Sequence, residues 1–316
     1  MHRRMLLISG AAAALTPLLS CRAQPSVTQL KPLGPGSRIR AVNPGTWMDP
    51  ERDLELLRAR CAAAGWNLEI PDRVLDQWRY FSATDRNRAA DMASAWGDPG
   101  VDAVFYLGGG WGAARVLEAG FRFPKRPKWA FGFSDSSSLL LAQQAAGLPG
   151  ALHGSFGGEE AQWRRTVQLL RDQAVAPLQG EAKRAGTARG PLLVANLTVA
   201  THLIGTPWLP SLKGAVLVLE DVGEAPYRVD RMLTHWRSAG LLQQLAGVAC
   251  GRFSWAEDDI LPGDFSMEEV LEERLGDLGI PLVVNLPLGH GQPNQTLPLG
   301  SIAELDGHRG RLHLRR

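Results

Sequence analysis

The sequence predicts an α/β fold in which an N-terminal open, mostly parallel sheet with flanking helices is followed by a linker and a smaller, mixed α+β C-terminal domain. Apolar, strand-like runs alternate with helix-like segments over residues 37–173, a pattern typical of a parallel sheet with helices on both faces. Residues 174–190 are rich in Gly, contain Pro177 and lack strong apolar periodicity, which indicates a linker. The 316 residues are enough for two domains of ordinary size.

The N-terminal domain, residues 37–173, is expected to hold five strands and five helices in alternation. Pro50 suits the first turn of a helix, and the unbroken apolar run 101–107 suits a buried parallel strand. Strands are expected at 38–42, 66–70, 101–107, 128–132 and 151–154, and helices at 50–64, 85–96, 111–119, 135–146 and 159–173.

The C-terminal domain, residues 191–316, has a mixed pattern of strands and helices. Ser266 and Glu269 form a capping box, which marks a helix start. Helices are expected at 195–203, 227–239 and 266–278, strands at 214–221, 248–253 and 281–287, and two closing segments at 296–305 and 311–314.

Charge and cysteine content exclude several classes of function. The net charge of +2 is too small to indicate a nucleic-acid partner. Cys61 and Cys250 lie far apart in helix-like and strand-like segments, so we expect buried free thiols and no disulfide framework. The chain has no CxxC motif, so we expect no structural metal.

Residues 1–23 have the plan of a secretory signal peptide: a basic start, an apolar stretch too short to span a membrane, and a polar end. Residues 3–7 resemble a twin-arginine signal, which would export a folded protein; general secretion is the alternative. Residues 18–21 resemble a bacterial lipobox, which would make Cys21 a lipid anchor, whereas cleavage near Ala23 would release a soluble protein. We expect an exported, periplasmic protein.

Ser134 is the strongest single candidate for chemistry. It follows the apolar run 129–133 and precedes a helix-like run. A serine at a sharp strand-to-helix turn exposes its hydroxyl to a base, and the N–H groups at the helix start, beginning with Asp135, can bind an oxyanion. Ser and Asp are also common helix N-caps, so the local pattern leaves both roles open.

The glycine-rich segment 108–112 also lies between a strand and a helix. It lacks the Lys-Ser/Thr of a phosphate-binding loop, and it follows the third strand, whereas a dinucleotide fingerprint follows the first. Gly109 and Gly110 could bring backbone N–H groups close to a substrate as an oxyanion loop. A simple tight turn is the alternative.

A base and an acid are available in the second half. His290 lies between two glycines just after a buried strand, where a general base is well placed on a rigid scaffold. Glu220 lies at the end of the apolar run 215–219, where a carboxylate needs a partner and could orient a histidine. A turn histidine and a capping or ion-paired carboxylate are the alternatives.

In chain order, these segments resemble the serine LD-carboxypeptidases, also called murein tetrapeptide carboxypeptidases, a family that includes microcin-immunity peptidases. The resemblance covers nearly the whole mature chain. The matching segments are the Gly-Gly-Trp-Gly loop of 109–115, the Gly-Phe-Ser-Asp elbow of 132–135, His-Gly at 153–154, Asn196-Leu197, the segments 203–208, 217–221 and 224–233, and Gly289-His290 followed by 297–300.

The resemblance implies a triad of Ser134, Glu220 and His290 in a cleft between the domains, with the N–H groups of Asp135, Gly109 and Gly110 binding the oxyanion. It implies hydrolysis of an amide between an L-centre and a C-terminal D-amino acid of a muropeptide, without metal or organic cofactor, and often a homodimer. A peptidase for a peptide antibiotic and a non-catalytic periplasmic muropeptide-binding lipoprotein are the alternatives.

The chain departs from the family pattern around the first domain's side of the cleft. Gly108 stands where many relatives have arginine, and Trp111 stands where they have tyrosine. The elbow continues as Ser136-Ser137, and His-Gly continues as Ser155-Phe156. These departures preserve the triad but put the identity of the substrate in question, since an arginine can hold a peptide carboxylate.

Overall fold

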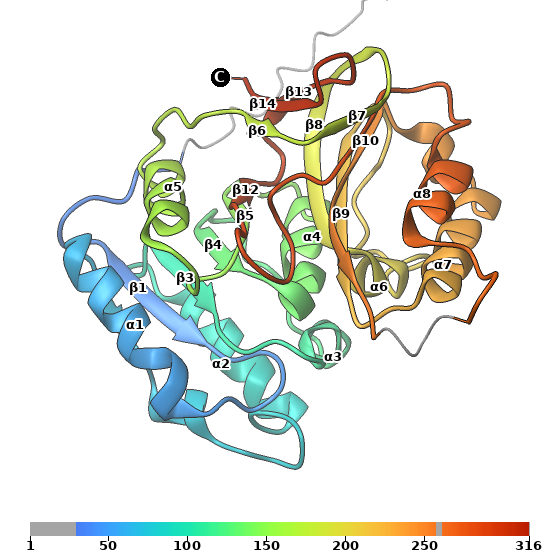
Figure 1. Cartoon of the computed structure of the whole chain (residues 1–316). Coiled ribbons are helices and arrows are strands. Elements are labelled where there is room, and N and C mark those ends of the chain that lie inside the picture. The colour runs from blue at the N-terminus through green and yellow to red at the C-terminus, as the bar shows by residue number, and fades with distance from the viewer. Residues whose placement is uncertain (1–29, 257–260, 316) are drawn as a thin grey trace, which may run out of the picture.

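A computed structural model describes residues 30–256 and 261–315, apart from the side chains of residues 50–53 (Figure 1). The predicted signal peptide and Cys21 lie outside the described residues. The described part of the chain has two sheets side by side, with helices around them (Figure 1). None of its helices is long and apolar enough to cross a membrane.

The first sheet has six strands in the order β12-β5-β4-β3-β1-β2. Its five N-terminal strands are all parallel, which confirms the predicted open sheet. The sixth strand comes from the far end of the chain and pairs antiparallel with β5 at the edge. The strands are β1 (Arg38–Val42), β2 (Asn67–Glu69), β3 (Ala103–Tyr106), β4 (Trp129–Gly132), β5 (Ala151–His153) and β12 (Leu297–Pro298).

Helices cover both faces of this sheet because its central strands are apolar on both sides. In β3, Ala103 and Phe105 belong to one core with α1 and α5, whereas Val104 and Tyr106 belong to another with α2, α3 and α4. This division follows from the two-residue period of a strand. The helices are α1 (Pro50–Ala63), α2 (Asp85–Gly97), α3 (Ala113–Glu118), α4 (Ser137–Ala145) and α5 (Glu160–Leu170).

The second sheet has eight strands in the order β6-β14-β13-β8-β9-β10-β11-β7. Its centre, from β8 to β11, is parallel, and the strands on either side pair antiparallel, as the predicted mixed domain requires. The strands are β6 (Leu178–Gln179), β7 (Glu181–Arg184), β8 (Thr187–Asn196), β9 (Val216–Val222), β10 (Gly247–Ser254), β11 (Leu282–Val284), β13 (Ile302–Asp306) and β14 (Arg311–Leu314). The helices are α6 (Leu197–Thr201), α7 (Pro226–Ser238) and α8 (Met267–Leu275).

The bounds of several elements differ from the sequence prediction, and two of these differences have a clear physical reason. Residues 174–190, predicted as a linker, contain β6, β7 and the start of β8. All four residues of β7 are exposed, so this edge strand carries no apolar period that the sequence could reveal. The helix predicted from residue 195 begins at Leu197, because the apolar run before it continues β8 through the buried Asn196.

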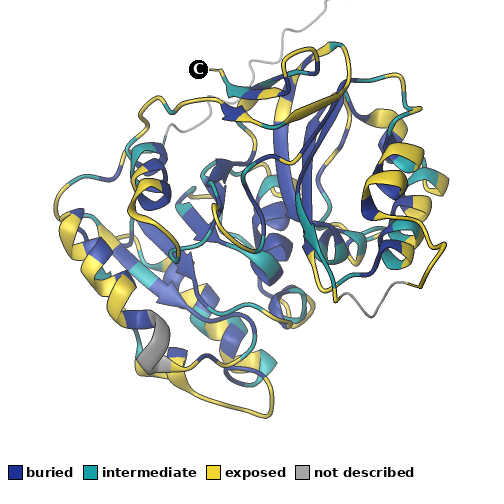
Figure 2. Ribbon diagram, in the orientation of Figure 1, coloured by how far each residue is buried: buried dark blue, intermediate teal, exposed yellow. Residues whose placement is uncertain are grey.

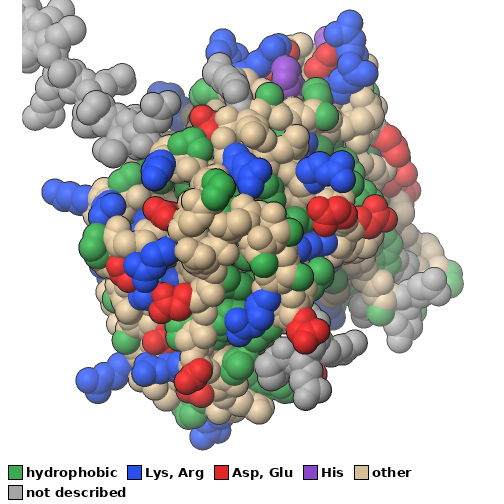
Figure 3. Space-filling model, turned by 90° about the vertical axis from the view of Figure 1, so that its left-hand side faces the viewer, with side chains coloured by type: hydrophobic (Ala, Val, Ile, Leu, Met, Phe, Trp, Pro, Cys, Tyr) green, Lys and Arg blue, Asp and Glu red, His purple; other side chains and the backbone are tan. Residues whose placement is uncertain are grey.

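A single apolar core joins the two halves. It contains the buried leucines of α4 together with Leu192, Val194 and the strand β9. Figure 2 shows buried residues along the strands of both sheets, whereas the outer faces of α1, α7 and α8 are exposed. Basic and acidic side chains are interspersed over the face shown in Figure 3, in keeping with the small net charge. Burial of α4 between the sheets fixes the two halves relative to each other.

The C-terminal segment 292–298 adds a second connection between the halves. Leu297 of β12 pairs with His153 of β5. The Thr296 hydroxyl lies 2.6 Å from that of Thr166, and the Thr296 carbonyl accepts a hydrogen bond from Arg165 at 3.0 Å. This buried anchor immediately follows the loop that contains His290, so it holds that loop against the first sheet.

We expect Gly154→Ala to loosen this anchor. A Cβ at Gly154 would lie 2.3 Å from Thr296 Oγ1 and 3.0 Å from its Cβ, and overpacking of this kind costs about 1–3 kcal/mol. Urea unfolding should show that loss. Gly157→Ala, in the same loop with only Ser155 Oγ at 3.9 Å, is the control; equal stability of the two variants would contradict the expectation.

Candidate active site

Ser134 lies at a sharp turn where β4 passes into α4 through one 3-10 turn. Its φ is +58°, a left-handed conformation that costs a non-glycine residue on the order of 1–3 kcal/mol and persists only where the surroundings enforce it. Gly132 permits the turn, since a Cβ there would lie 2.8 Å from Ser136 Cβ and 3.0 Å from Tyr106 Cβ. The turn is a nucleophile elbow in its geometry.

Three side chains predicted from the sequence form one chain of hydrogen bonds. Ser134 Oγ lies 3.1 Å from His290 Nε2, and His290 Nδ1 lies 2.7 Å from Glu220 Oε2. With the Nδ1 proton donated to the carboxylate, Nε2 is left to accept the serine proton, which is the arrangement that activates a serine. The same carboxylate oxygen also accepts the backbone N–H of His290 at 3.2 Å.

Each member of this chain follows from its place in a strand or loop. Glu220 belongs to β9 and is fully buried, so its charge requires the histidine as a partner. His290 lies in the loop after β11, where Gly289 has a φ of +106° and a Cβ would lie 3.0 Å from Glu220 Cβ. The Phe133 ring, next to Ser134, lies 4.5 Å from the His290 ring.

The glycine loop 108–112 follows β3 and borders Ser134. A Cβ at Gly109 would lie 3.9 Å from Ser134 Cβ and 4.0 Å from Ser134 Oγ. Gly108, Gly110 and Gly112 have positive φ angles, so the glycines are required by the backbone. Among the described residues, no hydrogen bond uses the N–H groups of Gly109 and Gly110.

Two buried charged side chains hold the glycine loop, and sequence analysis assigned a role to neither. Asp135 Oδ2 accepts the N–H of Ala113 at 2.8 Å, and burial raises the pKa of this carboxyl to about 7. Arg88 donates to the carbonyl of Gly112 at 2.8 Å and to that of Pro44, and its guanidinium lies 4.4 Å from the Phe81 ring. The prediction for Asp135 concerned its backbone N–H; its carboxyl group also braces the loop.

The two cysteines take no part in the hydrogen-bonded chain of Ser134, His290 and Glu220. Cys61 and Cys250 are buried free thiols, as predicted, and burial raises the pKa of each to about 12. Within residues 30–256 and 261–315, no three His, Cys, Asp or Glu side chains gather as a metal site would need.

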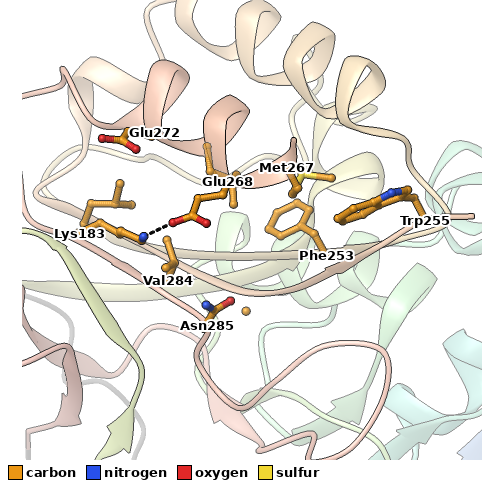
Figure 4. A pocket seen from close by; sticks show the side chains of 11 residues that line it. Lys183, Phe253, Trp255, Met267, Glu268, Glu272, Val284 and Asn285 are labelled. Atoms are coloured by element: carbon orange, nitrogen blue, oxygen red, sulfur yellow. Dashed lines mark hydrogen bonds and ion pairs between the residues drawn. The ribbon is translucent and has the colours of Figure 1, made fainter. Parts of the chain in front are cut away.

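An apolar cavity of about 220 Å³ lies between the second sheet and α8 (Figure 4). Its lining includes Phe253, Trp255, Met267 and the Lys183–Glu268 ion pair but no member of the triad.

We expect Asp135→Asn to remove a pH dependence of stability. The folded carboxyl, with a pKa of about 7 against an ordinary 3.8, binds its proton more tightly than the unfolded one. Its contribution to stability is therefore present at low pH and is lost as pH rises from about 4 to about 7, by at most about 4 kcal/mol.

Urea unfolding at pH 4.5 and pH 8 checks this expectation: the variant should lose less stability than the wild type over that interval. Asp277→Asn, which replaces an exposed carboxyl paired with Arg237, is the control. An unchanged pH dependence in Asp135→Asn would contradict the assignment.

The chain is similar in sequence and in fold to known proteins. Residues 39–154 match the LD-carboxypeptidase N-terminal domain, and residues 189–305 match the LD-carboxypeptidase C-terminal domain. A putative carboxypeptidase of Synechocystis sp. is 41% identical over 288 residues, which are 89% of this chain and 95% of the other. The murein tetrapeptide carboxypeptidase of Pseudomonas aeruginosa is 30% identical over 276 residues, 81% and 89% of the two chains.

Solved structures agree with these matches. The muramoyltetrapeptide carboxypeptidase from Oxalobacter formigenes has a TM-score of 0.74 and 25% identity, covering 88% of this chain and 98% of that one. The microcin C7 self immunity protein has a TM-score of 0.79 at 18% identity, covering 90% and 98%, which shows a shared fold. With both domains matched and the relatives aligned over most of their length, the chain belongs to the LD-carboxypeptidase family and is a serine-type LD-carboxypeptidase.

Proposed function

We propose that the enzyme hydrolyses the amide between an L-centre and a C-terminal D-amino acid, converting murein tetrapeptide into tripeptide and D-alanine, with Ser134, His290 and Glu220 as its catalytic triad. The observation that carries the proposal is the continuous hydrogen-bonded chain from Ser134 Oγ through His290 to the buried Glu220. A chain of this kind has no purpose in a binding protein, so its geometry favours catalysis.

Each residue has a defined part in the reaction. His290 Nε2 accepts the hydroxyl proton as Ser134 Oγ attacks the carbonyl carbon, and Glu220 stabilises the imidazolium that forms. The backbone N–H groups of Gly109, Gly110 and Asp135 are proposed to bind the oxyanion. His290 then gives its proton to the departing amine of the D-amino acid. Water attacks the acyl-enzyme through the same base and regenerates Ser134 Oγ–H.

The relatives favour a murein peptide as the substrate. The aligned proteins include a murein tetrapeptide carboxypeptidase of Pseudomonas aeruginosa and a probable murein peptide carboxypeptidase of Bacillus subtilis. The solved muramoyltetrapeptide carboxypeptidase from Oxalobacter formigenes is a relative of the same kind. The chain covers most of each of these proteins, so the proposal concerns the whole enzyme and not one domain.

A second candidate substrate is a peptide antibiotic. The microcin C7 self immunity protein shares the fold, and the glycine loop beside Ser134 has Gly108 and Trp111 where the family pattern has arginine and tyrosine. The triad is the same for either substrate, so the two candidates differ only in which amide is cleaved. The third, a non-catalytic muropeptide-binding lipoprotein, is disfavoured by the intact triad geometry.

We also propose that the enzyme is exported to the periplasm, where murein lies. The support is the signal-like sequence of residues 1–23.

Cys21 is the proposed lipid anchor, and a homodimer is the assembly that the family resemblance implies. Labelling cells with a fatty-acid analogue tests the anchor, with Cys21→Ser as the control: label in the wild type alone supports it.

The enzyme is expected to release D-alanine from murein tetrapeptide and not from its all-L analogue. Ser134→Ala and His290→Ala should each lower kcat by about 10³-fold or more, because a triad acts as a unit. Chiral chromatography of the released amino acid measures this directly.

Ser138→Ala is the matched control for that assay, since Ser138 is buried one helical turn away and its hydroxyl has no hydrogen-bond partner among the described residues. It should keep wild-type activity. Release of D-alanine at an undiminished rate by Ser134→Ala would overturn the triad. No release by the wild type, with cleavage of an antibiotic conjugate instead, would favour the second candidate.

A further inference from the structure

A second histidine, His153, is buried behind the triad, and the reaction as proposed does not use it. It is 1% exposed at the end of β5. Its backbone is fixed on both sides, because Gly132 of β4 and Leu297 of β12 are its partners in the sheet. The first sheet thus places an imidazole next to the elbow with little freedom to move.

The ring of Phe133 lies between those of His153 and His290 and contacts both. The two rings lie 5.1 Å apart with an interplanar angle of 63°, an edge-to-face contact. The same Phe133 ring lies 4.5 Å from the ring of His290. Because Phe133 also precedes Ser134 in the chain, the packing of His153 bears on both the base and the nucleophile.

Two buried polar atoms near this contact have no hydrogen-bond partner among the described residues: His153 Nε2 and Glu220 Oε1. His290 engages only the other oxygen of the carboxylate, Oε2. Buried polar groups are normally satisfied, directly or through a bridging water. A ring N–H donates a hydrogen bond and a carboxylate oxygen accepts one, so His153 Nε2 and Glu220 Oε1 could satisfy each other.

Burial keeps the ring of His153 neutral. Burial lowers its pKa to about 4, with Glu220 acting to raise it and His290 to lower it. Glu220 comes from β9 and His290 from the loop after β11. The strands paired with β5 contribute the uncharged Gly132 and Leu297. At neutral pH His153 therefore has one N–H to donate and adds no charge to the site.

We propose that His153 is a positioning residue for the triad: its Nε2–H serves the second oxygen of Glu220 through a bridging water, while its ring holds Phe133 against His290. The inference rests on the proposed function, because it assigns His153 a role in orienting the same carboxylate that orients His290. No covalent step is added.

Loss of the His153 donor should change the pH dependence of catalysis. A donor on Oε1 withdraws charge from the carboxylate that His290 faces. Without it, Glu220 stabilises the imidazolium form of His290 more strongly, so the pKa of His290 rises. The acid limb of kcat/KM, which reports the free enzyme, should then move to higher pH.

The test compares two substitutions of one residue. His153→Phe keeps an aromatic ring against Phe133 and removes the N–H, whereas His153→Gln keeps an N–H donor near Nε2 and removes the ring. In His153→Phe the acid limb for D-alanine release should rise by about half a pH unit or more, and in His153→Gln it should stay within about 0.2 units of the wild type. Gln143→Leu, which removes a buried amide bonded to the Lys128 and Pro149 carbonyls, is the control for general destabilisation and should leave the limb unmoved.

Titration of the His290 imidazole by NMR gives a readout that does not require turnover. It should show the same upward shift in His153→Phe, and His153→Leu replaces that variant if it does not fold. An unshifted His290 in folded His153→Phe or His153→Leu would overturn the proposal. Failure of the wild type to release D-alanine would instead count against the proposed function, since the titration still reports on His153.

Discussion

The hydrogen bond between Ser134 Oγ and His290 Nε2 joins two residues that follow strands of different sheets, β4 of the first and β11 of the second. A contact of 3.1 Å tolerates little relative movement, because catalysis requires the nucleophile and base in a near-attack geometry. The shared core around α4 and the antiparallel pairing of β12 with β5 meet that requirement. The shared core and this strand pairing therefore hold the two halves together around the triad.

The strained backbone of Ser134 and the buried charge of Glu220 both help to set the geometry of the triad. Ser134 keeps a left-handed backbone in a turn for which Gly132, which has no Cβ to meet Ser136, leaves room. Glu220 keeps a buried charge because His290 donates to it twice. The side chains of Asp135 and Arg88 hold the glycine loop by hydrogen bonds to its backbone. Neither side chain forms a hydrogen bond with a member of the triad. In α/β enzymes, residues that bind the ligand commonly lie at the carboxyl ends of parallel strands, where the ligand approaches the sheet.

Sequence analysis predicted much of this arrangement and missed particular parts for physical reasons. The parallel first sheet followed from apolar runs such as 101–107, and the three triad residues followed from strand ends and from the family resemblance. The pairing of β12 with β5 could not be predicted, because Leu297-Pro298 is too short to carry a period and its partner lies far away in sequence. The bracing roles of Asp135 and Arg88 were missed because burial of a charged side chain is a tertiary property. Edge strand β7 was missed because an exposed strand has no apolar face.

The proposed reaction requires Ser134 to be a nucleophile that His290 activates. Mass spectrometry of the intact protein after reaction with a fluorophosphonate, followed by peptide mapping, tests this most directly. We expect one covalent adduct on Ser134, with a labelling rate at least about 10²-fold lower in His290→Ala, because the serine then loses its base. An adduct on another residue, or labelling of Ser134 at an unchanged rate in His290→Ala, would contradict the account.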